Sequence, residues 1–271
     1  MIKANFHTHT TYCDGKNTPE EMVQAAIALG MTAIGFSGHS HSVTETYGMD
    51  QKTIVQYRAD ILALKEKYAG QIDILLGLEQ DSLCSAPDYN YDYLIGAVHA
   101  FFKDGHYICV DEAERTMLHN VEAYYGGDFY AYAEHYYQVL TETVLKYDPT
   151  FIAHFDLVTK FNEMLPVQIV GTADPRYMTA WMDAVDKIFE DTVELRKSGK
   201  PNRLETLGLI EAGDKPVFEI NTGAMAKGYR TTPYPAADQI KYIKNKGGIF
   251  VLSSDSHSTD KICYAFDKIE L

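Results

Sequence analysis

Short apolar runs recur along the chain, and most of them end at a histidine or a carboxylate. The runs cover residues 5–6, 33–36, 72–78, 94–98, 151–153 and 249–252. Such runs are typical of buried parallel strands. Polar side chains at the carboxyl ends of parallel strands gather on one face of an α/β barrel. The pattern therefore predicts a barrel whose strand ends bring a set of polar side chains together.

The stretches between these runs carry helix signals. Residues 18–21, Thr-Pro-Glu-Glu, form a capping box with proline at the first helical position, and Gly30 is a suitable stop for that helix. Further helices are expected at 50–68, at 111–146 with a break at Gly126-Gly127 that Asp128 can cap, and from Asp174 through Leu195.

The expected strands lie at residues 2–6, 33–37, 72–78, 93–98, 151–153, 217–220 and 249–252. Because most are separated by helices, they predict a parallel sheet with crossover connections. Seven strands favour a distorted, TIM-like (β/α)7 barrel, one strand short of the usual eight. We expect one domain over residues 1–271, since no low-complexity linker or repeat interrupts the chain.

Composition narrows the class of protein. The chain is 46% hydrophobic and 23% charged, which is ordinary for a globular protein, and its net charge is -14. So acidic a chain argues against nucleic-acid partners, which need a basic footprint. No apolar run is long enough to span a bilayer. Four scattered cysteines without a CxxC pair fit free thiols, so we expect a cytoplasmic protein; they are Cys13, Cys84, Cys109 and Cys263.

The polar residues at the strand ends have the chemistry of metal ligands. His7 and His9 stand two residues apart, so both imidazoles can leave one face of a strand and reach one metal. Taken alone, the pair could equally be half-buried histidines, and Asp14 could be an ordinary turn residue. Glu79 ends a long apolar run, where a lone buried carboxylate is costly and needs a metal or a basic partner.

Together these residues favour a metal site with several ions. Six of the ten histidines fall at expected strand ends. The nine candidate ligands, more than one ion can use, are His7, His9, Asp14, His39, Glu79, His99, His154, Asp255 and His257. We therefore expect two or three divalent ions of zinc, manganese or iron.

Motifs in the same order along nearly the whole chain carry a resemblance to a known family. They are His7-Thr8-His9 with Asp14-Gly15, His39, Gly77-Leu78-Glu79, Gly96-Ala97-Val98-His99, Ala153 to Leu157, Glu219-Ile220-Asn221-Thr222 and Ser254-Asp255-Ser256-His257. The chain resembles the polymerase and histidinol phosphatase (PHP) family of metal-dependent phosphoesterases, and within it the histidinol-phosphate phosphatase branch. The resemblance implies a distorted seven-stranded barrel with a trinuclear centre.

The resemblance also implies how the ligands are shared among the ions. One metal would be held by His7, His9, Glu79 and Asp255. A second would be held by Glu79, His99 and His154, and the third by Asp14, His39 and His257.

Two positions depart from the family pattern. Many members have Asp before the histidine that matches His39, and this chain has Gly38. Loss of that carboxylate can weaken or retune a site. Some relatives have His at position 14, and Asp14 is a harder ligand that shifts preference from zinc toward manganese or iron.

The implied reaction is hydrolysis of a small phosphate monoester, L-histidinol phosphate, by a hydroxide that bridges two metals. Glu79 and His257 would act within the centre, and Asp156 or a metal-bound water would protonate the leaving group. Candidate phosphate ligands are Lys160, Lys227 and Arg230, although each lysine could equally be a solvated surface charge.

Other interpretations remain open at this stage. A relative in the same family could cleave another phosphoester or a nucleotide phosphodiester, and a non-catalytic metal-binding module is also possible. Amidohydrolases share the HxH pair, but they usually need a metal-bridging lysine, and no lysine ends an expected strand. The tyrosine-rich stretch 101–137 is expected to be a helical hairpin that packs most of its tyrosines on the barrel; alternatively it forms a lid over the substrate.

Overall fold

The computed structural model describes residues 4–41, 47–164, 171–196, 203–211 and 213–269. Its centre is a sheet of seven parallel strands in the order β1-β2-β3-β4-β7-β8-β9. These strands are β1 (Ala4–Asn5), β2 (Ala33–Phe36), β3 (Asp73–Asp81), β4 (Tyr93–Ala97), β7 (Phe151–Ile152), β8 (Val217–Asn221) and β9 (Ile249–Ser253). Each expected strand is present, β3 runs past Glu79, and the seven-stranded barrel is confirmed.

The two edges of the sheet meet just beyond their strands. Thr8, which follows β1, forms a parallel bridge with Ser256, which follows β9. The His9 amide donates to the Ser256 carbonyl at 2.8 Å, and the Asn5 side chain donates to the Ser254 hydroxyl at 2.8 Å. The barrel is therefore nearly closed, and the segments that carry His7, His9, Asp255 and His257 lie side by side.

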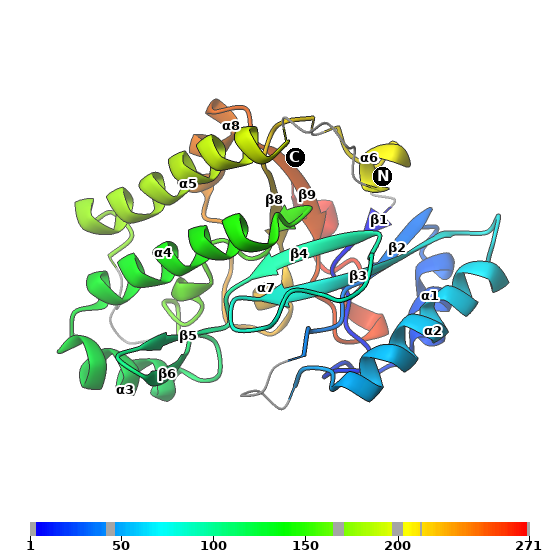
Figure 1. The fold of residues 1–271 in the computed structure, drawn as a ribbon, viewed down its shortest axis with the longest axis horizontal. Helices are drawn as coiled ribbons and strands as arrows, with labels where there is room; N and C mark the ends of the chain where they lie inside the picture. Colours follow the sequence, from blue (N-terminus) through cyan, green and yellow to red (C-terminus); the bar gives the residue numbers. More distant parts are fainter. Residues whose placement is uncertain (1–3, 42–46, 165–170, 197–202, 212, 270–271) are drawn as a thin grey trace.

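Helices surround this barrel (Figure 1). The described helices are α1 (Pro19–Ala28), α2 (Gln51–Lys67), α3 (Glu114–Tyr125), α4 (Phe129–Tyr147), α5 (Pro175–Arg196), α6 (Arg203–Thr206), α7 (Gly223–Ala226) and α8 (Ala237–Asn245). In Figure 1, α4 and α5 run along one side of the barrel, and α1 and α2 lie on the opposite side. None of the described helices is both long and apolar enough to cross a membrane.

Helix ends follow the local sequence signals. Thr18 caps α1 in a complete capping box with Glu21, and Gly30 follows the helix with φ +71°. Asp50 caps α2, and Asp128 caps α4 by accepting from the amides of Tyr130 and Ala131. These caps match the expected helix starts because each depends on residues within one turn.

The stretch from residue 101 differs from the expectation. Its first part is an antiparallel hairpin of β5 (Ala100–Lys103) and β6 (His106–Cys109), so a wholly helical hairpin was wrong. The turn is Asp104-Gly105, with both residues at positive φ, and an Asp-Gly pair favours a two-residue hairpin loop. Farther on, α3 and α4 are helical, and most of the tyrosines there pack on the barrel, with Tyr132, Tyr136 and Tyr137 fully buried. Helix α8 and the short helices α6 and α7 were not anticipated either.

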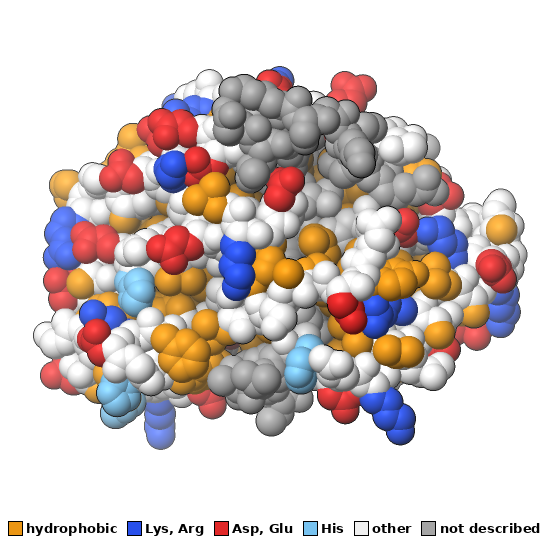
Figure 2. All heavy atoms as spheres, in the orientation of Figure 1, with side chains coloured by type: hydrophobic (Ala, Val, Ile, Leu, Met, Phe, Trp, Pro, Cys, Tyr) orange, Lys and Arg blue, Asp and Glu red, His pale blue; other side chains and the backbone are white. Residues whose placement is uncertain are grey.

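Charged side chains are interspersed over the surface. On the face drawn in Figure 2, the described basic side chains lie apart from one another among acidic and hydrophobic ones. Positive charge is therefore dispersed over the described part of this face.

Candidate metal centre and active site

Glu79 lies at the centre of the candidate ligands. Its side chain is 1% exposed at a position where β3 has passed the end of β2. One oxygen, Oε1, lies 3.1 Å from His154 Nε2 and 3.4 Å from His99 Nε2. The other, Oε2, lies 2.9 Å from His39 Nδ1 and close to both histidines of the HxH pair, 3.4 Å from His7 Nε2 and 3.5 Å from His9 Nε2. One carboxylate thus contacts five histidines from four separate loops.

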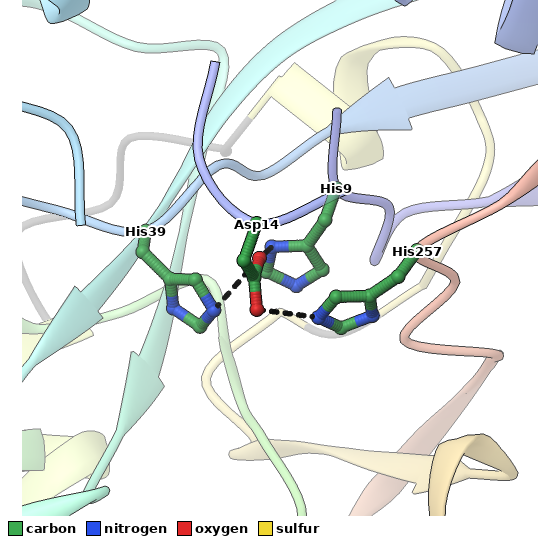
Figure 3. A group of neighbouring side chains, drawn as sticks. All are labelled: His9, Asp14, His39 and His257. Atoms are coloured by element: carbon green, nitrogen blue, oxygen red, sulfur yellow. Dashed lines mark hydrogen bonds and ion pairs between the residues drawn. The ribbon is translucent and has the colours of Figure 1, made fainter. Parts of the chain in front are cut away.

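A second carboxylate, Asp14, lies among three histidines (Figure 3). Its Oδ2 is 3.1 Å from His257 Nε2, and its Oδ1 is 3.6 Å from His39 Nε2 and 3.7 Å from His9 Nδ1. Asp255 completes the cluster, with its Oδ1 3.2 Å from His9 Nε2 and 3.7 Å from His7. The structure therefore brings all nine candidate ligands together.

Three groups of these residues have donor atoms within 4.8 Å of one another. They are His9-Asp14-His39-His257, His7-His9-Glu79 and His39-Glu79-His99. The grouping overlaps the division expected from the sequence, but His9 and His39 each belong to two groups. His9 faces one group through Nε2 and the other through Nδ1.

Unpaired polar atoms show that these residues suit metal ions. Among the described residues, buried His7 Nε2, His9 Nε2 and Glu79 Oε2 form no hydrogen bond of normal geometry, although Glu79 Oε2 lies 3.4 Å and 3.5 Å from the two nitrogens. Buried polar atoms rarely stay unpaired, and imidazole nitrogen with carboxylate oxygen is a donor set for zinc, manganese and iron. The residues present therefore fit divalent cations.

The electrostatics of the cluster point the same way. Burial works against the ionised form of Glu79, yet the surrounding histidines, led by His7 and His39, hold its pKa well below the usual range. Burial also opposes a charged His99, but Glu79 and Asp81 outweigh it and raise the pKa of His99 to about 10. Burial together with His257 and His39 lowers the pKa of His9 to about 3. The carboxylates thus stay ionised and favour cations beside them.

Two further carboxylates orient the histidines. Glu219 accepts from His7 Nδ1 at 2.7 Å through Oε1 and from the His154 amide at 2.9 Å through Oε2. Asp81 Oδ2 accepts from the His99 amide at 2.9 Å and from His99 Nδ1 at 3.0 Å. A ring whose Nδ1–H is held in this way presents Nε2 as a ligand.

Asp81 was not among the candidates taken from the sequence. Its position could have indicated a role, because it lies two residues after Glu79 on the same strand and alternate residues of a strand share a face. Glu219 was noticed only as part of a motif, without a role.

An open cavity of about 500 Å³ adjoins the cluster. Its metal-ligand wall includes Asp14, His39, His99, Asp255 and His257. The remaining wall carries tyrosines, acids and two lysines, among them Tyr107, Tyr229, Asp111, Glu112, Lys160 and Lys227. Most tyrosines of the stretch from residue 101 pack on the barrel, whereas Tyr107 lines the cavity.

The two lysines of the cavity differ in their surroundings. Lys160 Nζ donates to the Asp111 carbonyl at 2.7 Å and lies 3.3 Å from the Asp111 carboxylate. Lys227 has an exposed side chain within the cavity. Crowding by protein opposes its charge, but nearby carboxylates, led by Asp255 and Asp14, raise the pKa of Lys227. Both lysines therefore line the cavity, Lys160 in contact with Asp111 and Lys227 with an exposed side chain.

Asp156 and Arg230, two residues expected to meet the substrate, lie elsewhere. The Arg230 guanidinium contacts the Asp156 carboxylate at 3.1 Å, and both side chains are almost fully buried. Neither residue lines the cavity. The structure therefore pairs them with each other, outside the lining of the cavity.

The space beside Gly38 is filled by other side chains. A Cβ at this position would lie 3.0 Å from Met49 Cε and 3.6 Å from Cys13 Sγ. Cys13 Sγ itself lies 3.5 Å from His9 Nδ1. A methionine and a thiol thus pack where the family resemblance led us to expect a carboxylate.

Comparison with known proteins agrees with this arrangement. The model of the PHP domain family matches residues 5–196. This chain belongs to the PHP domain family. A histidinol-phosphatase of Bacillus subtilis is 25% identical to this PHP protein over 98% of both chains.

Two solved structures share the fold of this PHP protein. A putative histidinol phosphatase from Listeria monocytogenes matches 99% of this chain and 100% of its own, with a TM-score of 0.77 and 19% identity. A histidinol phosphate phosphatase from Lactococcus lactis, complexed with zinc, L-histidinol and phosphate, has a TM-score of 0.62 and 19% identity. It covers 95% of this chain and 87% of its own.

Proposed function

We propose that this PHP protein is a metal-dependent phosphomonoesterase that hydrolyses L-histidinol phosphate to L-histidinol and phosphate, a reaction of histidine biosynthesis. The observation that carries the proposal is the cluster around Glu79, where buried histidine and carboxylate donors border a cavity that also contains two lysines. Relatives in the family support the substrate, because the B. subtilis protein is a histidinol-phosphatase and the L. lactis protein binds zinc, L-histidinol and phosphate.

The proposed centre holds two or three zinc, manganese or iron ions. His7, His9, Glu79 and Asp255 would hold one ion; Glu79, His99 and His154 would hold another; Asp14, His39 and His257 would hold the third. Bound cations of this kind acidify a water and neutralise charge on phosphoryl oxygens. Glu79 and His257 contribute by fixing the positions of the ions, and Glu219 and Asp81 fix the histidine rings.

Lys227 and Lys160 bind the phosphate group from the other wall of the cavity. Their ammonium groups supply positive charge in a protein that is otherwise strongly acidic. Because the Asp156 carboxylate is held by Arg230 and lies off the cavity, we assign protonation of the leaving alkoxide to water in the open cavity.

The direct test is phosphate release from a panel of phosphomonoesters, including L-histidinol phosphate, after loading with zinc, manganese or iron. We expect strong preference for L-histidinol phosphate. His99→Ala and Glu79→Ala should each lower turnover at least about a thousandfold, because each removes a ligand of the centre. His119→Ala, on the exposed face of α3, is the matched control and should keep normal turnover. Undiminished turnover after thorough chelation would contradict the proposal, and equal weak release from many esters would remove the named substrate.

The role of Lys227 predicts a separate effect. Lys227→Ala should raise the KM for the phosphoester by roughly tenfold or more, since a hydrogen bond to a charged group contributes about 1.5–3 kcal/mol. Lys261→Ala, which removes a surface lysine beside Asp260, should leave the KM unchanged. Steady-state kinetics with inorganic phosphate as competitor measure both effects. An unchanged KM in Lys227→Ala would exclude the lysine from phosphate binding.

A further inference from the structure

The backbone at His154 is strained. His154 directly follows β7 and has φ +20°, a conformation that costs a residue with a side chain free energy. Such strain persists only where surrounding contacts hold it. Glu219 holds the His154 amide, and the Leu157 amide donates to the His154 carbonyl at 2.9 Å. A buried ion pair that begins two residues further along, at Asp156, adds contacts to this turn.

That ion pair joins the turn after β7 to the loop after β8. Arg230 Nη1 donates to Asp156 Oδ2 at 3.1 Å and to the Thr159 hydroxyl at 3.0 Å, while Nη2 donates to the Pro233 carbonyl at 3.3 Å. The Thr159 hydroxyl donates in turn to the Asp156 carbonyl at 2.8 Å. Three hydrogen bonds from one planar guanidinium fix both loops relative to each other.

The same arginine is also linked to the His154 ring through Tyr234. Its guanidinium lies 4.3 Å from the centre of the Tyr234 ring, and Tyr234 meets the His154 ring edge to face at 6.3 Å. Tyr234 is itself fixed by two backbone hydrogen bonds with Asn221 at the end of β8. Arg230 therefore supports His154 both through the backbone turn and through the Tyr234 ring, which contacts His154 edge to face.

We propose that Arg230, with Asp156, is a positioning residue that holds His154 in the orientation needed to bind a metal ion, and that it does not bind the phosphate group. The inference rests on the proposed role of His154 as a metal ligand, shared with Glu79 and His99. It gives a role to two buried, charged side chains that do not line the cavity.

The two possible roles of Arg230 have different kinetic signatures. A phosphate ligand affects KM and inhibition by phosphate, whereas a residue that positions a metal ligand affects metal affinity, and affects kcat only while the site is not saturated. Loss of a group that orients a metal ligand typically weakens metal affinity by about 10- to 100-fold.

The test compares Arg230→Met, which keeps the unbranched side chain as far as the position of Nε but removes every donor, with Arg230→Lys. Zinc affinity is measured by competition with a chromogenic chelator, alongside kcat, KM and the thermal midpoint of unfolding. We expect Arg230→Met to weaken the affinity of one zinc ion at least tenfold, with kcat restored by excess zinc and KM within about twofold of wild type. Arg230→Lys should recover part of the affinity, because one ammonium can still reach Asp156. Arg176→Met, which removes a surface arginine paired with Asp128 and Glu134, is the control.

Two results would overturn the inference. A raised KM with weaker phosphate inhibition and unchanged zinc affinity would make Arg230 a phosphate ligand. A lower thermal midpoint with unchanged zinc affinity would make the pair purely structural. If Arg230→Met does not fold, Thr159→Val decides, since it removes one hydroxyl of the network and should weaken zinc affinity about threefold; unchanged affinity would again overturn the inference. The zinc titration needs no substrate, so it stands even if L-histidinol phosphate is not the substrate.

Discussion

At the scale of single residues, the site depends on carboxylates that hold histidine rings as much as on the ligands. Glu79 and Asp81 lie on the same face of β3, and both contact His99, one at Nε2 and the other at Nδ1. Asp81 accepts two hydrogen bonds from His99 and one from the Leu83 amide. The orientation of His99 therefore depends on one residue that is not itself a candidate ligand.

This dependence predicts the effect of Asp81→Asn. The amide keeps the size of the side chain but loses the charge that holds the Nδ1 proton of His99, so we expect metal affinity to fall about tenfold. Asp88→Asn, at a carboxylate that pairs with Arg58 at the surface, should leave affinity unchanged. Chelator competition measures both, and equal affinities for the two variants would contradict the role of Asp81.

The sequence predicted which residues could be ligands but not which side chains would hold them. Most of the ligands could be found because they follow apolar runs, and barrel topology brings strand ends together. The contact between Arg230 and Asp156 could not be found, since 74 positions separate them and the pairing depends on how two loops pack. Likewise, the space at Gly38 is filled by Met49, which belongs to a different segment of the chain, so the sequence alone did not show this contact.

At the scale of helices and strands, locally encoded features were the most predictable. The capping residues Thr18 and Asp128 were correct because a cap is decided within one turn. The β5–β6 hairpin was missed because the tyrosine-rich pattern around it favoured a helix, and the signal of Asp104-Gly105 was given no weight. Short helices such as α7 carry too few residues for a hydrophobic period to show.

The cap of α4 gives a test at this scale. Asp128→Ala should lower the free energy of unfolding by about 1 kcal/mol at pH 7, and Asp128→Asn by less, because an amide still caps the helix. The hydrogen bond from Arg176, followed by that from the Ala131 amide, lowers the pKa of Asp128. A folded pKa below the unfolded value of about 3.9 means that this stabilisation is present above that pH and is lost as the pH falls below it.

Urea unfolding of the Asp128 variants at pH 7 and near pH 3 is the measurement. The difference in the free energy of unfolding between wild type and Asp128→Ala should be smaller at the lower pH. A difference that grows on acidification would contradict the assignment of the charged cap.

At the scale of the whole molecule, the same segments close the barrel and carry the candidate ligands. The candidate ligands lie near the carboxyl ends of six of the seven barrel strands or in the loops after them, and the bridge between Thr8 and Ser256 holds the first and last of these segments together. Binding of ions at this junction would therefore stabilise the closed barrel as well as the site.

Metal removal should accordingly lower the thermal stability of the entire chain. A ligand present at a thousand times its dissociation constant contributes about 4 kcal/mol, which corresponds to roughly 10 °C in the midpoint for a chain of this size. Differential scanning calorimetry before and after chelation, and after zinc is added back, measures the change. A thermal midpoint that does not change when zinc is added would show that metal binding does not stabilise the fold.

The hydrogen bond between Asn5 and Ser254 joins residues 249 positions apart. During translation, the first histidines of the centre leave the ribosome long before Asp255 and His257 are made. The complete ligand set therefore exists only after His257 has been made, and a chain that stops before that residue cannot form it. Complete metal loading is thus confined to chains that have been translated past His257, which distinguishes them from chains interrupted earlier.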